Sequence, residues 1–195
     1  MGKEINERPE FDEIVSELGR INSKDKKKKD VRRILGFTIV VAAISILISL
    51  SVLPVFQIKG YSMSPNIVNG DVVIGFKLSK INKGDVVAFN HNNSVLVKRV
   101  IAVEGDTVDI DNDGNVYVND EMIEEPYISE KNYGTQVTVD FPYQVPVDSL
   151  FLLGDERKDS IDSRSKTIGS ISKDLVIGKI VFRIWPFNRI AGNFL

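Results

Sequence analysis

The sequence predicts a mostly β protein: a single N-terminal transmembrane helix followed by one antiparallel β domain, built as a sheet or a barrel. Two observations support this prediction. Residues 34–56 carry no charge over 23 positions, and beyond Gln57 apolar residues occur in short β-branched runs separated by Gly, Asp and Asn. The chain of 195 residues is long enough for one such domain with appendages. We therefore divide it into a cytoplasmic polar and basic tail (1–33), a transmembrane anchor (34–56) and an extracytoplasmic catalytic domain (57–195).

The first part of the tail, residues 1–23, is polar. Phe11, Ile14, Val15 and Leu18 are spaced as on one face of a helix, which fits a short amphipathic helix. We favour a frayed tail for this segment and assign it no function.

The anchor would be about 35 Å long as a helix, enough to cross roughly 30 Å of hydrocarbon with some tilt. Residues 24–33 before it are rich in Lys and Arg, whereas Lys59 is the only basic residue between it and Lys77. The positive-inside rule then places the N-terminus in the cytoplasm and the large domain outside, with the chain crossing the cell membrane once. A cleaved secretion signal and a buried helix of a soluble protein are alternatives, but the apolar run is longer than a typical signal.

The β domain contains seven runs that we expect to form strands, and a Gly-Asp turn sequence occurs in it twice. Gly70-Asp71 and Gly84-Asp85 each precede a run of valines, and we interpret both as structural turns that begin a strand. The seven expected strands are 72–74, 86–89, 95–103, 116–118, 137–139, 150–153 and 181–184.

An acidic stretch, residues 109–120, fits half of a calcium-binding EF-hand loop. An EF-hand needs a helix on each side, but both flanks here alternate as strands do. Asp113-Gly114 is also a strong hairpin signal. We therefore favour a β-hairpin and expect no metal site.

The amino-acid composition excludes several classes of function. The net charge is −2, and residues 57–195 hold fifteen basic and nineteen acidic residues, so no basic patch indicates a nucleic-acid partner. The chain has no cysteine and one histidine, His91, which excludes disulfides, thiol nucleophiles and multi-histidine metal centres. We expect no cofactor.

A serine, Ser62, lies in Gly60–Pro65, shortly after the apolar run. A serine hydroxyl needs a base to become a nucleophile. His91 lies in a polar turn and is the less favoured candidate. Lys98 lies in an apolar strand-like stretch, 95–103, where burial would lower its pKa enough for the neutral amine to act as the base. A lysine whose apolar stem simply packs along a strand is the alternative.

A third cluster, Gly154–Arg164, follows the apolar run 150–153 and is dense in opposite charges. Its composition fits a solvated loop, or a hydrogen-bonded shell that holds a catalytic lysine in place.

Together these segments resemble the boxes of the bacterial type I signal peptidases, membrane-bound serine proteases that remove signal peptides from exported proteins. Four stretches carry the resemblance in the family's order, and with the anchor it covers nearly all of residues 55–187. The four stretches are Gly60–Pro65, Gly70–Val73, Lys98–Asp106 and Gly154–Arg164.

The resemblance implies a Ser/Lys dyad. Ser62 would attack the peptide carbonyl to form an acyl-enzyme, with its backbone N–H helping to bind the oxyanion. Lys98 would take the proton, pass it to the leaving amine and then activate water. Ser160 matches a serine that hydrogen-bonds the lysine, and Asp162 and Arg164 match an ion pair that supports the site.

The resemblance also implies the substrate: preprotein signal peptides, cut after small residues in an Ala-x-Ala pattern. By their positions in the boxes, Ile58, Met63, Leu96 and Val97 are expected to line the substrate pockets, although ordinary core packing is the alternative. The lipid membrane and the protein export machinery are the expected partners. Apolar residues in 185–187 or 141–143 are candidates to enter the lipid interface.

The sequence departs from the family's pattern at four positions. Gly60 replaces a serine that completes the oxyanion hole in some members, which leaves the second donor unassigned. The other three departures are Asn66, Glu156 and Lys158.

Three other readings remain. Self-cleaving repressors share the catalytic core but lack a membrane span. A non-catalytic membrane-anchored β domain would be expected to lose Ser62 or Lys98. A peptidase dedicated to particular substrates, such as pilins, stays open. The sequence does not indicate which preproteins are cut or the oligomeric state.

Overall fold

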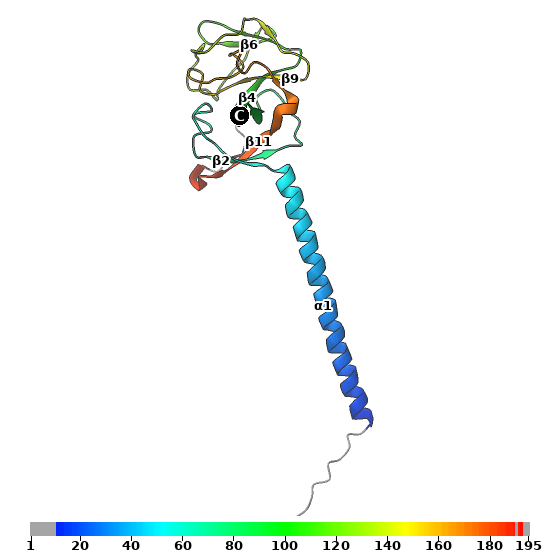
Figure 1. Cartoon of the computed structure of the whole chain (residues 1–195). Coiled ribbons are helices and arrows are strands. Elements are labelled where there is room, and N and C mark those ends of the chain that lie inside the picture. Colours follow the sequence, from blue (N-terminus) through cyan, green and yellow to red (C-terminus); the bar gives the residue numbers. More distant parts are fainter. Residues whose placement is uncertain (1–10, 190, 193–195) are drawn as a thin grey trace, which may run out of the picture. The chain divides into compact units, whose positions relative to one another are not determined.

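The structure, a computed structural model, describes residues 11–189, 191 and 192. The chain forms two compact units, Met1–Ser49 and Leu50–Leu195. The first consists of most of one long helix, and the second is a mostly antiparallel β domain (Figure 1). The predicted fold class, an N-terminal transmembrane-type helix followed by antiparallel β structure, is confirmed.

Helix α1 runs from Phe11 to Val52. Its segment Ile14–Ser49 is long and apolar enough to cross a membrane, and no residue of its apolar window is buried. The expected frayed tail is wrong for residues 11–23, because they continue the same helix. Their helical spacing and the absence of proline between Pro9 and Pro54 explain this continuation. Residues 1–10 lie outside the described part of the chain.

The helix ends four residues before the predicted end of the anchor at residue 56. Pro54 lacks an N–H group and cannot extend the helix bonding pattern. Val55 and Phe56 instead pair with Ile74 and Val73 in a β-ladder, and the Pro54 carbonyl accepts a hydrogen bond from the Gly75 N–H at 2.8 Å. Residues 53–56 therefore belong to the β domain.

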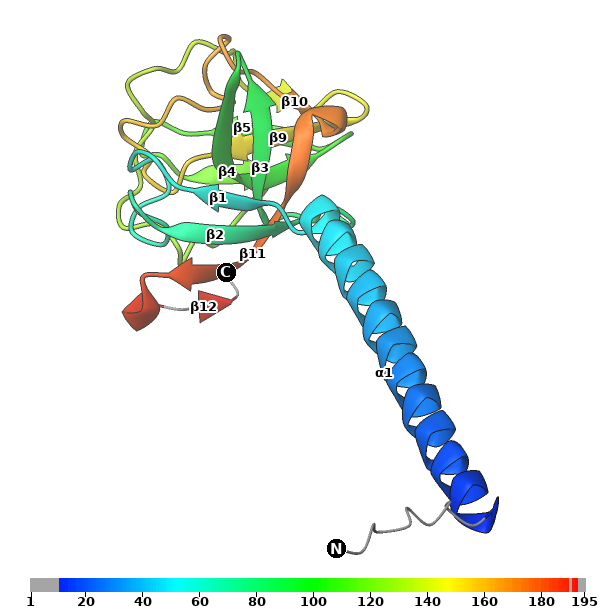
Figure 2. The same ribbon diagram turned by 60° about the horizontal axis from the view of Figure 1, so that its bottom comes forward.

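The larger sheet has the strand order β1-β2-β11-β3-β4-β9-β10, with β12 beside β11, and every pair is antiparallel (Figure 2). Its strands are β1 (Val55–Gln57), β2 (Val72–Phe76), β3 (Val86–His91), β4 (Ser94–Val103), β9 (Ser149–Leu153), β10 (Ile171–Ser172), β11 (Val176–Trp185) and β12 (Ala191–Gly192). The 3₁₀ turns η1 (Lys173–Leu175) and η2 (Phe187–Arg189) flank β11.

The smaller sheet has the order β7-β6-β5-β8 and contains the predicted hairpin. Its strands are β5 (Thr107–Ile110), β6 (Val116–Val118), β7 (Glu121–Met122) and β8 (Tyr143–Gln144). Strands β5 and β6 pair across the acidic stretch, so the EF-hand alternative fails for lack of flanking helices. In the described part of the chain, no three His, Cys, Asp or Glu side chains are grouped to hold a metal.

Six of the seven predicted strands lie within strands of these sheets, and the run 137–139 does not. Backbone N–H groups of Thr138 and Val139 both donate to the Arg164 carbonyl, at 2.9 and 3.0 Å. A single loop carbonyl thus takes the place of a sheet partner for this segment.

The two Gly-Asp devices are turns that begin strands, as predicted. Gly70 and Gly84 have φ of 91° and 89°, a region that glycine enters without steric cost. Each following aspartate accepts a hydrogen bond from the backbone N–H three residues earlier, at 3.0 Å for Asp71 and 2.8 Å for Asp85. Strands β2 and β3 start at the next residue in each case.

The core of the β domain consists of three buried apolar clusters. One joins β4 and β9 to the smaller sheet, one lies beneath the Ser62 segment, and the third packs β3 against β9 and β10. Val87 and Val100, in the third cluster, are fully buried. Lys98 pairs with Val87, so its side chain leaves the sheet on the same face as Leu96 and Val100.

Candidate active site

Ser62 lies in a compact loop between β1 and β2. Backbone bonds from Ile58 N to Asp71 O (2.8 Å) and from Gly70 N to Ile58 O (2.9 Å) close the base of the loop. Within it, Ser64 N donates to Tyr61 O at 2.9 Å, and the Ser62 carbonyl accepts from Glu156 N at 3.1 Å. The backbone on both sides of the serine is therefore fixed, and a fixed backbone sets the direction of the hydroxyl.

Lys98 is buried in the middle of β4, with 3% of its surface exposed. Its Nζ donates a hydrogen bond to Ser160 Oγ at 3.0 Å. Among the described residues no hydrogen bond joins Lys98 Nζ to Ser62 Oγ, although both residues line the same cavity. Hydrogen bonds between catalytic groups are often completed only when substrate binds.

Burial lowers the pKa of Lys98 from 10.5 to about 8. The largest cause is desolvation of the ammonium. The Asp162 carboxylate acts in the opposite direction and raises the pKa, and the Arg164 guanidinium lowers it again. The effects of Asp162 and Arg164 on the Lys98 pKa partly cancel, so burial of the amine sets the direction in which the pKa moves.

Asp162 and Arg164 form a buried bidentate ion pair, with both bonds at 2.8 Å. Asp162 also accepts from Gly154 N at 3.0 Å. Arg164 donates to the carbonyls of Tyr133 and Arg157, at 2.8 Å each. The charged cluster is therefore a hydrogen-bonded buried shell, and the solvated-loop alternative is wrong for these side chains.

Gly154 allows this shell to approach the nucleophile. A Cβ at this position would lie 2.6 Å from the Ser62 carbonyl oxygen and would overlap Ser160 Oγ. No larger residue fits at position 154 without moving the Ser62 loop away from Ser160, the serine that Lys98 binds. The glycine at the start of the charged cluster is thus a packing requirement of the site.

A second buried network lies next to the site. Its member Asp155 was expected to be structural as part of the charged cluster, but its partners were not predicted. Arg99, fully buried, makes a bidentate pair with Asp155 at 2.8 Å for both bonds, and lies 3.9 Å from the centre of the Tyr127 ring. Asn66 Nδ2 donates to Asp155 Oδ2 at 2.8 Å and to the Tyr127 carbonyl at 2.6 Å.

This network joins the serine loop to β4 and to the 154–164 loop. Asn66 is one of the positions where the sequence departs from the family pattern. That departure was the only feature of the sequence that singled Asn66 out. Tyr127, and Glu125 that pairs with Arg157, lie in a segment without strand periodicity, so nothing in the sequence indicated them.

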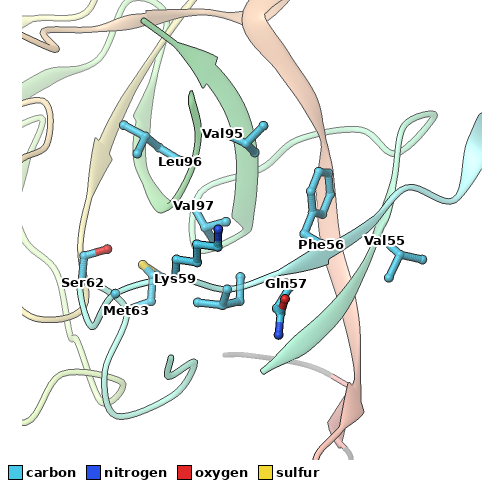
Figure 3. A pocket seen from close by; sticks show the side chains of 11 residues that line it. Val55, Phe56, Gln57, Lys59, Ser62, Met63, Val95, Leu96 and Val97 are labelled. Atoms are coloured by element: carbon cyan, nitrogen blue, oxygen red, sulfur yellow. The ribbon is translucent and has the colours of Figure 1, made fainter. Parts of the chain in front are cut away.

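A groove of about 350 Å³ lies on one side of Ser62, and all four predicted pocket residues, Ile58, Met63, Leu96 and Val97, line it. Figure 3 shows Phe56, Gln57 and Lys59 on one wall, Val95, Leu96 and Val97 on the other, and Ser62 with Met63 at one end. Ile58 and Met63 are buried, at 7% and 2% exposure, so they also serve the core.

A second cavity, of about 430 Å³, also includes Ser62 and is lined by Lys98; it shares Lys59, Gly60, Ser62 and Leu96 with the groove. His91 also lines it, at the end of β3, with Nε2 3.0 Å from Asn92 Nδ2. The histidine is half-buried. The structure therefore gathers Ser62, Lys98 and His91 around one cavity. Of the two candidate bases, Lys98 is the one whose side chain is hydrogen-bonded to the 154–164 cluster in the described domain.

The family model described as signal peptidase, peptidase S26, matches residues 31–185 of this chain. The chain belongs to the signal peptidase family. Signal peptidase IB of Staphylococcus aureus is 37% identical over 158 residues, covering 71% of this chain and 81% of the relative. Signal peptidase I U of Bacillus subtilis is 33% identical over 177 residues, covering 85% and 94%.

A crystal structure of a signal peptidase I from Enterococcus faecalis is also similar, with 28% identity and a TM-score of 0.43. The match covers 52% of this chain and 97% of the Enterococcus faecalis chain. Family membership makes the chain a hydrolase, a serine endopeptidase of the signal peptidase type, and confirms the resemblance in the four sequence boxes. Its N-terminal helix is consistent with a membrane-anchored enzyme.

Proposed function

We propose that this chain removes signal peptides from exported preproteins with Ser62 as nucleophile and neutral Lys98 as general base. The observation that carries this proposal is the environment of Lys98. It is a buried amine with a lowered pKa, it is held by Ser160, and it lines the same cavity as Ser62. In the described domain, His91 has no comparable link to the buried shell.

The lowered pKa makes the base available. With a pKa of about 8, roughly one lysine in ten is neutral at pH 7. At 10.5 the neutral fraction would be about three in ten thousand. Ser62 Oγ transfers its proton to Lys98 Nζ as it attacks the carbonyl, and the protonated amine then gives that proton to the leaving amine. Neutral Lys98 next takes a proton from water as the water attacks the acyl-enzyme, and it returns that proton to Ser62 Oγ when the ester bond breaks.

Oxyanion stabilisation is assigned to the Ser62 N–H. Gly60, where some family members carry a serine, has φ of 92° and donates its N–H to Asn69 Oδ1 at 3.1 Å. That N–H is therefore engaged within the loop. The second donor stays unassigned.

The groove offers two strand edges to an extended peptide. Strand β1 pairs with β2 along one edge, and β4 pairs with β9 only from Arg99 onward, so residues 95–98 have β3 on one side only. A signal peptide end can add as a strand between them, with backbone hydrogen bonds giving affinity. Apolar side chains of Ile58, Met63, Leu96 and Val97 restrict the space beneath it, which favours small residues at −3 and −1.

We also propose that α1 anchors the enzyme in the cell membrane with its N-terminus in the cytoplasm, because basic residues cluster at 24–33. A retained helix keeps the active site at the membrane, where signal peptides end, and raises the local substrate concentration. The export machinery is a proposed neighbour on this basis. Trp185 and Phe187 are exposed and fit a lipid interface, whereas Phe141 packs against Phe151 in the core and does not.

The test is cleavage of a preprotein by the detergent-solubilised full chain, with sequencing of the new N-terminus. Substrates with Ala, Val or Phe at −3 and −1 should be cut in that order of preference, directly after the −1 residue. The Ser62→Ala variant should leave all of them intact, and Ser64→Ala, two residues away, is the matched control. Equal cleavage of Ala and Phe substrates would refute the pocket assignment, and cleavage by Ser62→Ala would refute the nucleophile.

A further inference from the structure

Two cavities meet at Ser62, and the presence of Lys98 in only one of them decides how each is used. The groove of Figure 3 includes Ser62 but not Lys98. The second cavity includes both, together with His91 and Thr167. A peptide that presents its scissile carbonyl to Ser62 must extend in two directions, one toward each cavity.

The leaving amine identifies the direction. When the peptide bond breaks, the nitrogen of the first mature residue must receive the proton that Lys98 Nζ carries, so that nitrogen must lie beside Lys98. Since Lys98 lines only the second cavity, the mature protein leaves on that side and the signal peptide occupies the groove. This step rests on the proposed Ser62–Lys98 mechanism.

We propose that the second cavity binds the first two residues of the mature protein, at +1 and +2, and favours acidic side chains over basic ones there. Its apolar wall consists of Leu96, Ile161 and Ile168. Lys59, which also lines the groove, contributes a positive charge, and among the described residues that line the cavity none is a carboxylate. The acid next in sequence, Asp162, is 1% exposed and paired with Arg164, so its charge is already balanced.

Two walls of this cavity are tied to the catalytic groups. His91 ends β3, and Asn92 begins the turn that leads into β4, which carries Lys98. Thr167 and Ile168 follow the 154–164 loop and are held by Ser165, which accepts from Thr167 N through Oγ (3.3 Å) and from Ile168 N through its carbonyl (3.0 Å). A bound side chain would therefore contact walls whose position relative to the dyad is fixed, and fixed contacts can determine specificity.

The test uses preproteins with one signal peptide and Glu, Gln or Lys at +1 and +2, cut by the full chain in detergent. We expect kcat/KM to fall in the order Glu, Gln, Lys. Thr167→Glu places a carboxylate in the cavity and should lower the Glu-to-Lys ratio by about fivefold, the factor of one exposed charge pair. His91→Glu is a second variant with the same expectation. Val147→Glu is the matched control, because Val147 is 81% exposed and lines neither of these two cavities.

The outcomes separate this proposal from the mechanism on which it rests. A Glu-to-Lys ratio near one in the wild type, or a ratio that Val147→Glu changes as much as Thr167→Glu does, would overturn the assignment of the cavity while Ser62-dependent cleavage continued. A wild type that cuts none of the substrates, or a Ser62→Ala variant that cuts them all, would overturn the mechanism and this proposal together. A ratio lowered by Thr167→Glu and His91→Glu but not by Val147→Glu supports the proposal.

Discussion

Replacing the buried lysine should make the protein more stable while abolishing its activity. In Lys98→Met an apolar side chain of similar length replaces an amine that is 3% exposed. The pKa of Lys98 is about 8 in the folded protein, against 10.5 for the unfolded chain. Below pH 8 folding must therefore bury an ammonium that prefers water, and this lowers the free energy of unfolding.

The magnitude follows from the two pKa values. Between pH 8 and 10.5 the unfolded chain holds one proton more than the folded protein, so stability rises with pH in this window and is lowest below it. The difference between 10.5 and about 8 corresponds to about 3 kcal/mol at pH 7 and about 1 kcal/mol at pH 9.5. Losing the hydrogen bond to Ser160 subtracts about 1 kcal/mol. Lys98→Met should thus gain about 2 kcal/mol at pH 7 and almost nothing at pH 9.5.

The assay is denaturant unfolding of the full chain in detergent, followed by the fluorescence of Trp185, the single tryptophan. Lys80→Met, at an exposed position, is the matched control and should change stability by less than about 0.5 kcal/mol at either pH. A Lys98→Met variant that is less stable than the wild type at pH 7, or equally stabilised at both pH values, would refute the buried-amine reasoning.

Three further variants test the surroundings of the dyad. Gly154→Ala should lose more than 10²-fold in kcat/KM in a cleavage assay, because its Cβ would displace the Ser62 loop, and a displacement of about 1 Å can have this effect; full activity would contradict the packing argument. Ser160→Ala should lower kcat more than it raises KM, because it removes the hydrogen bond that holds the Lys98 amine without changing the substrate groove. A change in KM alone would contradict a positioning role for Ser160. Asn66→Ala removes two hydrogen bonds and should destabilise by about 1–3 kcal/mol in the unfolding assay, and an unchanged midpoint would show that the link is dispensable.

Local patterns predicted the fold well where one rule dominated. The uncharged run predicted a helix, and β-branched runs such as 95–103 predicted strands. The errors lie where tertiary contacts dominate. Residues 53–56 pair with β2 instead of extending the helix, and 137–139 bond to the Arg164 carbonyl. Neither partner is near in sequence, so no local pattern could indicate it.

For the candidate site, too, local motifs were predicted and long-range contacts were missed. Ser62, Lys98 and Ser160 were singled out because they lie in recognisable boxes, and the structure brings them together. The pairing of Arg99 with Asp155, and the contacts of Tyr127 and Asn66, were not foreseen. These residues support the dyad through long-range contacts, and their identities carry no periodic signal.

The most direct test of the central claim, that neutral Lys98 is the base for Ser62, is the pH dependence of kcat/KM for cleavage of an Ala-x-Ala preprotein by the full chain. Below the pKa of the base the rate should rise about tenfold per pH unit, and it should level off near pH 8, where burial places Lys98. A profile that is already flat by pH 7 would contradict the claim, because Lys98 would still be mostly protonated there and another group would have to act as the base.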